Sequence, residues 1–216
     1  MKTALVIGLG RYGRHIVEKL SEMNIEVMAV DKKEENVQAV MDSATNAMIG
    51  DCTKEAFIRT LGVNDFDVCY VAIGEDFLAS LEATFFLKEY GAKKIVARAA
   101  RDTQEKILMK NGADAVVYPE RHMGEWTAVQ YSSDNIFDYI PLSKNLAVFE
   151  VKVPDSWVGK SIVTIDVRKK YHLNIIGIKQ GDEMLPAPSP DYLFNLNERL
   201  LVLGTAKQIR DTFDTE

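Results

Sequence analysis

A glycine-rich loop near the N-terminus constrains the fold more than any other feature. Residues 8–13 read Gly-Leu-Gly-Arg-Tyr-Gly, directly after an apolar run at residues 4–7 and at the start of a segment with helical periodicity. In such a strand–turn–helix unit, Gly8 permits the tight turn, Gly10 lets the backbone approach a phosphate, and Gly13 lets the helix pack closely on the strand. The helix N-terminus adds free N–H groups and a positive dipole. The loop therefore predicts a nucleotide-phosphate site.

Asp31 gives a second signal for the same kind of site. It stands eighteen residues after Gly13, at the end of the second apolar run. A carboxylate at this position accepts hydrogen bonds from the ribose hydroxyls of an adenosine and repels a 2′-phosphate. The alternative is structural, with glycines that only make a turn and an Asp31 that caps the next helix. Because the two signals lie in register, they favour the nucleotide site.

The first half of the chain has the pattern of an α/β fold. Short apolar runs with little polar alternation occupy residues 4–7, 27–30, 47–49, 68–73, 95–97 and 115–117. Such runs are typical of strands that are covered on both faces of a parallel sheet. Segments with helical periodicity lie between them, at residues 13–23, 77–90 and 103–111. The pattern predicts a Rossmann-like, doubly wound parallel sheet of six strands.

The sequence pattern changes near Pro119, because all six prolines lie from this residue onward. Residues 123–131 have helical spacing and contain Trp126, which indicates either a crossover helix between the halves or the last helix of the first domain. Strand-like runs at 148–153, 174–179 and 200–204, with helices near 164–171 and from 207, predict a small α+β unit. We expect residues 1–134 to form a nucleotide-binding domain with the crossover helix, and 135–216 to form a C-terminal ligand-binding domain.

The composition argues against several classes of function. Lys and Arg total 26 against 32 Asp and Glu, so the net charge of −6 disfavours nucleic acid as a partner. No apolar run approaches the roughly 20 residues of a membrane span, so we expect a cytosolic protein without direct membrane insertion. Cys52 and Cys69 form no CxxC pair, and the three histidines have neither metal-ligand spacing nor a Ser-His-Asp arrangement. We therefore expect no catalytic site.

The ends of the third and fourth predicted strands supply further candidates, since ligands of such sheets lie over the carboxyl ends of the strands. The candidate pocket walls are Asp51, Cys52, Ala72, Ile73 and Gly74. Asp51 is read equally well as a cap for a helix that begins near Thr53.

Arg11, a cation inside the loop, would crowd a nicotinamide dinucleotide but neutralise extra phosphates, which favours ATP or ADP. The alternative for Arg11 is a solvated surface arginine.

Taken together, the loop, Asp31, Gly50-Asp51, residues 72–74, the Pro-Glu-Arg-His-Met-Gly stretch at 119–124 and the small C-terminal unit resemble a known family. They are similar, over nearly the whole chain, to the RCK (KTN) regulatory subunits of Ktr and Trk potassium uptake systems. The resemblance implies a non-enzymatic gating subunit on the cytoplasmic side of the membrane. It also implies dimers of RCK domains that assemble into an octameric ring, bound to a KtrB-type potassium-translocating membrane subunit and responsive to ATP or ADP.

The resemblance also implies roles for individual residues. Arg11 would reach the γ-phosphate of the neighbouring site across a dimer, Arg98 would approach the phosphates, and Glu120 would hold a cation (magnesium, calcium or sodium) between paired ATP molecules. The alternatives are structural: Glu120 would be a carboxylate at the start of a helix, stabilised by the helix dipole, and Arg98 would be a solvated cation at the end of a strand. The implied nucleotide-binding set is Gly8, Gly10, Arg11, Tyr12, Gly13, Asp31, Lys32, Asp51, Cys52, Ala72, Ile73, Gly74, Arg98 and Glu120.

A second ligand site follows from the same resemblance. The run Ile-Val-x-x-Asp-x-Arg at residues 162–168, with Asn-Ile-Ile at 174–176, resembles the cyclic di-AMP site of the family's C-terminal domains, with Val163 where Leu or Ile is usual. A two-fold dinucleotide suits a two-fold dimer interface. In the alternative, the isoleucines are core residues and Asp166 and Arg168 form a local surface pair. The implied contacts are Ile162, Asp166, Arg168, His172, Leu173, Asn174 and Ile175.

Two rival functions remain at the level of the sequence. An NAD-dependent oxidoreductase is compatible with the glycine loop and Asp31, although the remaining chain is small for a substrate domain. A stand-alone dinucleotide receptor, acting on a partner other than a potassium-translocating subunit, is compatible with both ligand sites.

Overall fold

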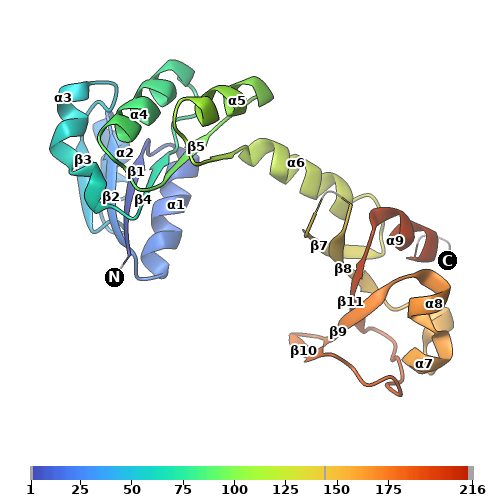
Figure 1. The fold of residues 1–216 in the computed structure, drawn as a ribbon. Coiled ribbons are helices and arrows are strands. Elements are labelled where there is room, and N and C mark those ends of the chain that lie inside the picture. Colours follow the sequence, from blue (N-terminus) through green and yellow to red (C-terminus); the bar gives the residue numbers. More distant parts are fainter. Residues whose placement is uncertain (1, 144, 214–216) are drawn as a thin grey trace. The chain divides into compact units, whose positions relative to one another are not determined.

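The computed structural model describes residues 2–143 and 145–213 and divides into two compact units, Met1–Arg121 and His122–Glu216 (Figure 1). Each unit has its own sheet, with a core cluster on each face of the first sheet and one core in the second unit. None of the helices in the described ranges is long and apolar enough to cross a membrane.

The first unit contains the predicted parallel sheet. Its six strands run in the order β3-β2-β1-β4-β5-β6, and neighbouring strands pair in parallel. The order reverses beside β1, as in a doubly wound fold. The strands are β1 Thr3–Ile7, β2 Glu26–Asp31, β3 Asn46–Ile49, β4 Val68–Val71, β5 Ile95–Arg98 and β6 Ala115–Val117. All six apolar runs are thereby confirmed as strands.

Helices cover both faces of this sheet, because the strands are apolar on both sides. In β1, Ala4 and Val6 belong to one core cluster, and Leu5 and Ile7 to the other. Burial of each of the three larger side chains, Leu5, Val6 and Ile7, stabilises the fold by roughly 1.5–3 kcal/mol. On one face lie α1 Arg11–Glu22 and α2 Glu34–Gln38. On the other lie α3 Glu55–Ile58, α4 Phe77–Glu89 and α5 Asp102–Lys110, with short 3-10 turns at Arg59–Leu61 and Val63–Asp65.

Helix α6, Pro119–Gln130, starts four residues before the predicted crossover segment. Proline suits the first position of a helix because it has no N–H to leave unpaired. From His122 on, α6 belongs to the second unit, where it packs on β7 (Ile136–Pro141): the Trp126 indole donates to Asp138 and the Gln130 amide donates to the Phe137 carbonyl.

The second unit is an antiparallel sheet in the order β10-β9-β11-β8-β7. One face packs against Trp157 and α9, and the core includes Phe149, Phe194 and Phe213. Both edge strands, β7 and β10, end at a proline. The elements are β7 Ile136–Pro141, β8 Ala147–Lys152, a 3-10 turn at Asp155–Trp157, α7 Ile162–Ile165, α8 Val167–Tyr171, β9 Asn174–Gln180, β10 Glu183–Pro186, β11 Arg199–Gly204 and α9 Ala206–Phe213.

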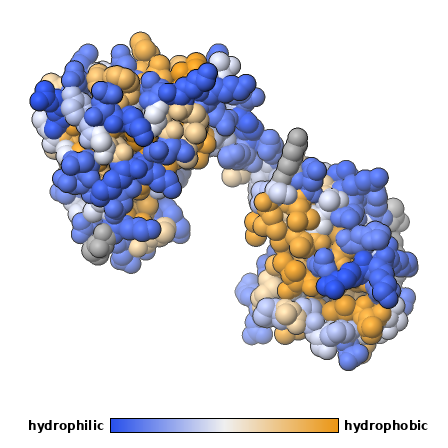
Figure 2. Space-filling model, viewed as in Figure 1, coloured by the Kyte–Doolittle hydropathy of each residue, from blue (hydrophilic) through white to orange (hydrophobic). Residues whose placement is uncertain are grey.

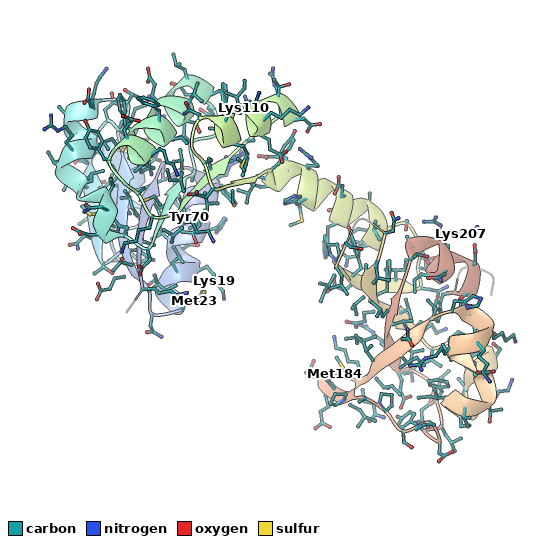
Figure 3. The ribbon with its side chains drawn as sticks, viewed as in Figure 1. Lys19, Met23, Tyr70, Lys110, Met184 and Lys207 are labelled. Atoms are coloured by element: carbon teal, nitrogen blue, oxygen red, sulfur yellow. The ribbon has the colours of Figure 1, made fainter. Side chains whose placement is uncertain are left out.

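An apolar area appears on the visible face of the second unit in Figure 2. Large apolar side chains of this unit that are exposed include Met184, which Figure 3 labels on β10. Others include Ile140, Leu142, Val163, Ile176, Leu185, Leu193 and Leu196.

Candidate functional site

The glycine loop between β1 and α1 shows a different constraint at each of its three glycines. Gly8 has φ +91°, and a Cβ there would lie 2.9 Å from the Ile73 backbone nitrogen. A Cβ on Gly13 would lie only 1.9 Å from the Gly8 carbonyl oxygen. A Cβ on Gly10, in contrast, would meet no described atom within 4 Å. The fold itself therefore requires the first and third glycines, whereas the second borders open space in which a phosphate can approach.

The first turn of α1 can bind an anion. Gly10 is the N-cap residue and has no side chain to cap the helix, and the first helical bond there joins the Arg14 N–H to the Gly10 carbonyl oxygen at 3.0 Å. Helix geometry leaves the preceding N–H groups without intrahelical acceptors, and the dipole makes this end positive. No acidic residue lies in the first turn, and Arg11 is exposed there. The donors therefore fit a phosphate group.

Asp31 at the end of β2 is tied to the loop. Its Oδ2 accepts from the Leu9 N–H at 2.7 Å and from the Asn36 side-chain amide at 3.1 Å, while its Oδ1 accepts from the Lys33 N–H at 2.8 Å. A carboxylate oxygen has two lone pairs, so Oδ1 retains acceptor capacity for a ribose hydroxyl. Lys32 follows Asp31 and is exposed.

Two residues that the sequence did not indicate support this arrangement. Arg14 Nε donates to the Leu9 carbonyl at 2.9 Å, and Arg14 Nη2 donates to the Asn36 side-chain oxygen at 3.1 Å. Asp31 in turn accepts from Leu9 and from Asn36. The four hydrogen bonds together form a closed ring around Leu9. An arginine and an asparagine 22 residues apart carry no sequence pattern that predicts the contact, because the pairing depends on the packing of α1 against α2.

Two candidate residues follow β3: Asp51 is partly buried, and Cys52 is buried in the core. Asp51 Oδ1 accepts from the Thr53 hydroxyl at 2.8 Å and from the Thr53 N–H at 3.0 Å, and the hydroxyl contact lowers the pKa of Asp51. Asp51 is not the N-cap of α3, a position that Lys54 occupies. Cys52 belongs to the core, where burial, followed by the nearby Asp51 and Asp31 carboxylates, raises its pKa to about 12. Its thiol is therefore a packing group.

The turn after β4 lies against both the loop and Arg98. Ala72 is buried and donates its N–H to the Ile7 carbonyl at 2.7 Å, and Ile73 lies against Gly8. A Cβ on Gly74 would lie 2.3 Å from Arg98 Nη1. The absence of a side chain at Gly74 therefore makes room for the guanidinium.

Arg98, the last residue of β5, forms an ion pair with Glu120 in the first turn of α6. The Arg98 Cζ lies 5.5 Å from the centroid of the Tyr12 ring, and burial raises the pKa of Tyr12 although the Arg98 charge opposes this. Within the described residues, Arg98 Nε is buried and has no hydrogen-bond partner. Tyr70, labelled in Figure 3, is a partly buried residue of β4.

The structure thus brings the first-unit candidates to one edge of the sheet, because parallel strands all end on the same side. They are contributed by the ends of β1, β2, β3, β4 and β5 and by the first turns of α1 and α6. No group of three or more His, Cys, Asp or Glu that could hold a metal ion occurs in the described ranges.

In the second unit, the candidates surround α8. Arg168 Nε donates to the Asn174 side-chain oxygen at 2.8 Å, and Asp166 pairs with Lys169 at 4.0 Å. Asp166 and His172 bracket the helix with left-handed backbone, at φ 53° and 56°. Ile162 and Ile175 are half-buried at the edge of the second core, whereas Leu173 is fully buried within it. A ligand can therefore be contacted by Arg168, Asn174, Ile162 and Ile175. Leu173 is part of the core beneath this surface.

Comparison with known proteins gives full-length similarities. The TrkA-N domain family matches residues 4–119, and the TrkA-C domain family matches residues 146–215. Ktr system potassium uptake protein C of Bacillus subtilis (strain 168) is 39% identical over 208 residues, which cover 96% of this chain and 94% of that protein. Ktr system potassium uptake protein A of the same organism is 36% identical over 209 residues, covering 97% and 94%.

One solved structure with a similar fold is that of the GsuK RCK domain. It aligns with a TM-score of 0.69 and 19% sequence identity, over 96% of this chain. The chain spans 46% of that structure's length. The likeness shows that the chain has the fold of an RCK domain.

Proposed function

Since the chain belongs to the family of Ktr system potassium uptake proteins, built from TrkA-N and TrkA-C domains, we propose that it is a nucleotide-controlled regulatory subunit of a potassium uptake system. The observation that carries the proposal is the arrangement of the glycine loop. Uncapped N–H groups of α1 lie beside open space at Gly10, and Asp31 is held next to them. The site has the donors for phosphate and the acceptor for ribose.

The ligand of the first unit is ATP or ADP. Arg11 is an exposed cation in the first turn of α1, and the Arg98 guanidinium lies beside Tyr12 in the same turn. Two cations near one helix N-terminus favour a ligand with two or three consecutive phosphates. Glu120 provides the carboxylate for a cation, which would be magnesium, calcium or sodium.

The second unit binds cyclic di-AMP at a two-fold interface between copies. Arg168 provides a guanidinium for a phosphate, Asn174 a hydrogen-bonding amide, and the half-buried Ile162 and Ile175 apolar contacts for adenine. The exposed apolar side chains of this unit support an interface between copies of the chain.

The protein acts in the cytoplasm, as a homo-oligomer built from RCK dimers into an octameric ring, attached to a KtrB-type membrane subunit that translocates potassium. Its role is to change ring shape on nucleotide binding rather than to catalyse a reaction. A ligand shifts such an equilibrium only by its difference in affinity for the two states, and the γ-phosphate supplies that difference.

Calorimetric titration of the purified protein with ATP, ADP, NADH and cyclic di-AMP tests the proposal. We expect ATP and ADP to bind more tightly than NADH, and cyclic di-AMP to bind independently of them. NADH binding tighter than ATP, accompanied by hydride transfer, would instead support an oxidoreductase. Purification from membranes without any potassium-translocating protein would support a stand-alone dinucleotide receptor.

A further inference from the structure

Arg98 places a cation at the edge of the proposed phosphate site. The guanidinium fills the space left by Gly74, and Cζ lies 5.5 Å from the ring centroid of Tyr12, which immediately precedes Gly13 of the loop. The Arg98 side chain is 20% exposed, so its charge is only partly screened by water. A phosphate on the first turn of α1 comes within reach of this cation.

The Arg98 guanidinium already has a carboxylate partner in the same chain, Glu120. Glu120 pairs with Arg98 Nη2, whereas Arg98 Nε is buried and lacks a hydrogen-bond partner among the described residues. A phosphate oxygen makes the same charge-assisted contact with a guanidinium that a carboxylate makes. Glu120 and a phosphate are therefore alternative partners for the same group.

The first turn of α6 is held by a second arginine pair that does not involve the loop. Arg121 Nη2 lies 2.6 Å from Asp102 and 3.3 Å from Glu105 of α5, and Arg121 Cζ lies 4.6 Å from the ring centroid of Tyr118. Two adjacent residues of this turn thus make two tethers, Glu120 to β5 and Arg121 to α5. Only the Glu120 tether uses the cation beside the phosphate loop.

We propose that Glu120 is an internal competitor for the phosphate subsite, which sets nucleotide affinity and releases the start of α6 when a phosphate takes over Arg98. The inference rests on the proposed nucleotide site and deepens it. A Glu120 displaced from Arg98 becomes free to ligate a cation, so cation binding at this carboxylate should follow nucleotide binding rather than precede it.

Titration with ADP in the presence of EDTA, which removes any contribution from divalent cations, tests the competition. Glu120→Gln keeps the shape of the side chain but removes its charge, and we expect it to bind ADP roughly three- to tenfold more tightly than the wild type. Arg121→Gln is the matched control, because it breaks the neighbouring tether without freeing Arg98. Its ADP affinity should stay within about twofold of the wild type.

Hydrogen exchange of the backbone amides at residues 120–124 provides a readout that does not depend on affinity. In the wild type, ADP should accelerate exchange in this turn. In Glu120→Gln, exchange should be fast without ADP and should change little when ADP is added. Circular dichroism checks that both variants keep the fold, as expected for a Glu120 side chain that is 56% exposed.

The outcomes separate this inference from the proposed function. If ADP binds the wild type but Glu120→Gln binds it equally or less tightly, the competition is wrong and the nucleotide site stands. If ADP fails to bind but pyrophosphate binds, and binds more tightly to Glu120→Gln, the competition stands and the choice of nucleotide is wrong. If neither anion binds either protein, both proposals fall.

Discussion

Arg11 is the side chain that should distinguish ATP from ADP. It is exposed in the first turn of α1 and free to reach a third phosphate, whereas the α- and β-phosphates are served by backbone N–H groups. We expect Arg11→Ala to change ADP affinity by less than about twofold and to weaken ATP binding roughly tenfold, the size of one charge-assisted contact. Calorimetry measures both values. His15→Ala, an exposed change one turn further along α1, is the control, and equal losses for ATP and ADP would contradict the assignment.

Arg168 should be the corresponding determinant in the second unit. Its hydrogen bond to Asn174 fixes the guanidinium on the side of α8 that faces β9. We expect Arg168→Ala to weaken cyclic di-AMP binding roughly tenfold or more and to leave ADP binding unchanged. Lys169→Ala removes an adjacent exposed charge of the same helix and should have little effect. Unchanged affinity in Arg168→Ala would remove this residue from the site.

Glu198 is a buried carboxylate, only 4% exposed, that should make stability depend on pH. Burial alone would raise its pKa, but hydrogen bonds from Tyr192, Asn195 and Gln180 outweigh this and lower the pKa below its usual value. The lowered pKa means that its stabilisation is present above the unfolded-state pKa and is lost as the pH falls through the folded-state pKa.

We therefore expect Glu198→Gln to cost roughly 1–3 kcal/mol of unfolding free energy at pH 7, and to cost progressively less below about pH 4. Urea titrations at several pH values measure the difference between the two proteins. A difference that is constant down to about pH 3 would show that the carboxylate charge is not the cause.

At the level of elements, the loop between β1 and α1 allows stability and binding to be separated. The Cβ of Gly10→Ala would meet no described atom within 4 Å, so the change should cost at most about 1 kcal/mol, the size of a less favourable N-cap residue. ADP affinity should fall at least about tenfold, because a methyl group stands where the phosphate approaches. Gly13→Ala drives a Cβ against the Gly8 carbonyl and should cost roughly 2–4 kcal/mol of stability. Thermal denaturation and calorimetry of both variants check this. A Gly10→Ala protein that binds ADP normally would contradict the proposed phosphate position.

The elements that the sequence predicted are those that are buried on both sides. The six parallel strands are short apolar runs, and few structures besides a covered parallel sheet produce this pattern. The strand β10 was not predicted because all four of its residues are exposed and give no apolar alternation. The strand β7 was missed because Asp138, which accepts from Trp126, interrupts its apolar pattern beside an irregular register. The helix α2 is only five residues long and presents too little periodicity to recognise.

For the whole molecule, the division into two compact units predicts two unfolding events that respond to different ligands. ADP at about one hundred times its dissociation constant should stabilise the first unit by about 2.7 kcal/mol and leave the transition of the second unit in place. Cyclic di-AMP should stabilise the second unit and leave the transition of the first unit in place. Differential scanning calorimetry with each ligand alone measures these shifts. A single transition that moves with both ligands would show that the two units unfold together.

The sequence also located most of the candidate site, because the residues at the carboxyl ends of parallel strands meet at one edge. It did not indicate that Arg98 pairs with Glu120 or that Arg14 reaches Asn36, since each contact joins residues 22 positions apart and depends on packing.

We retain 1–134 and 135–216 as the proposed functional domains, which assigns α6 to the nucleotide domain. By contacts alone, the chain divides at Arg121, because the later part of α6 packs on β7.

The prolines that end β7 and β10 have a consequence for the proposed assembly of this protein from many copies. A proline nitrogen carries no hydrogen, so Pro141 and Pro186 cannot donate to a strand of a second molecule laid along the free edge. Such strand addition leads to fibrils and aggregates, and Met184 and Leu185 on β10 would otherwise favour it. The second unit can thus expose apolar side chains for assembly while both margins of its sheet resist uncontrolled polymerisation.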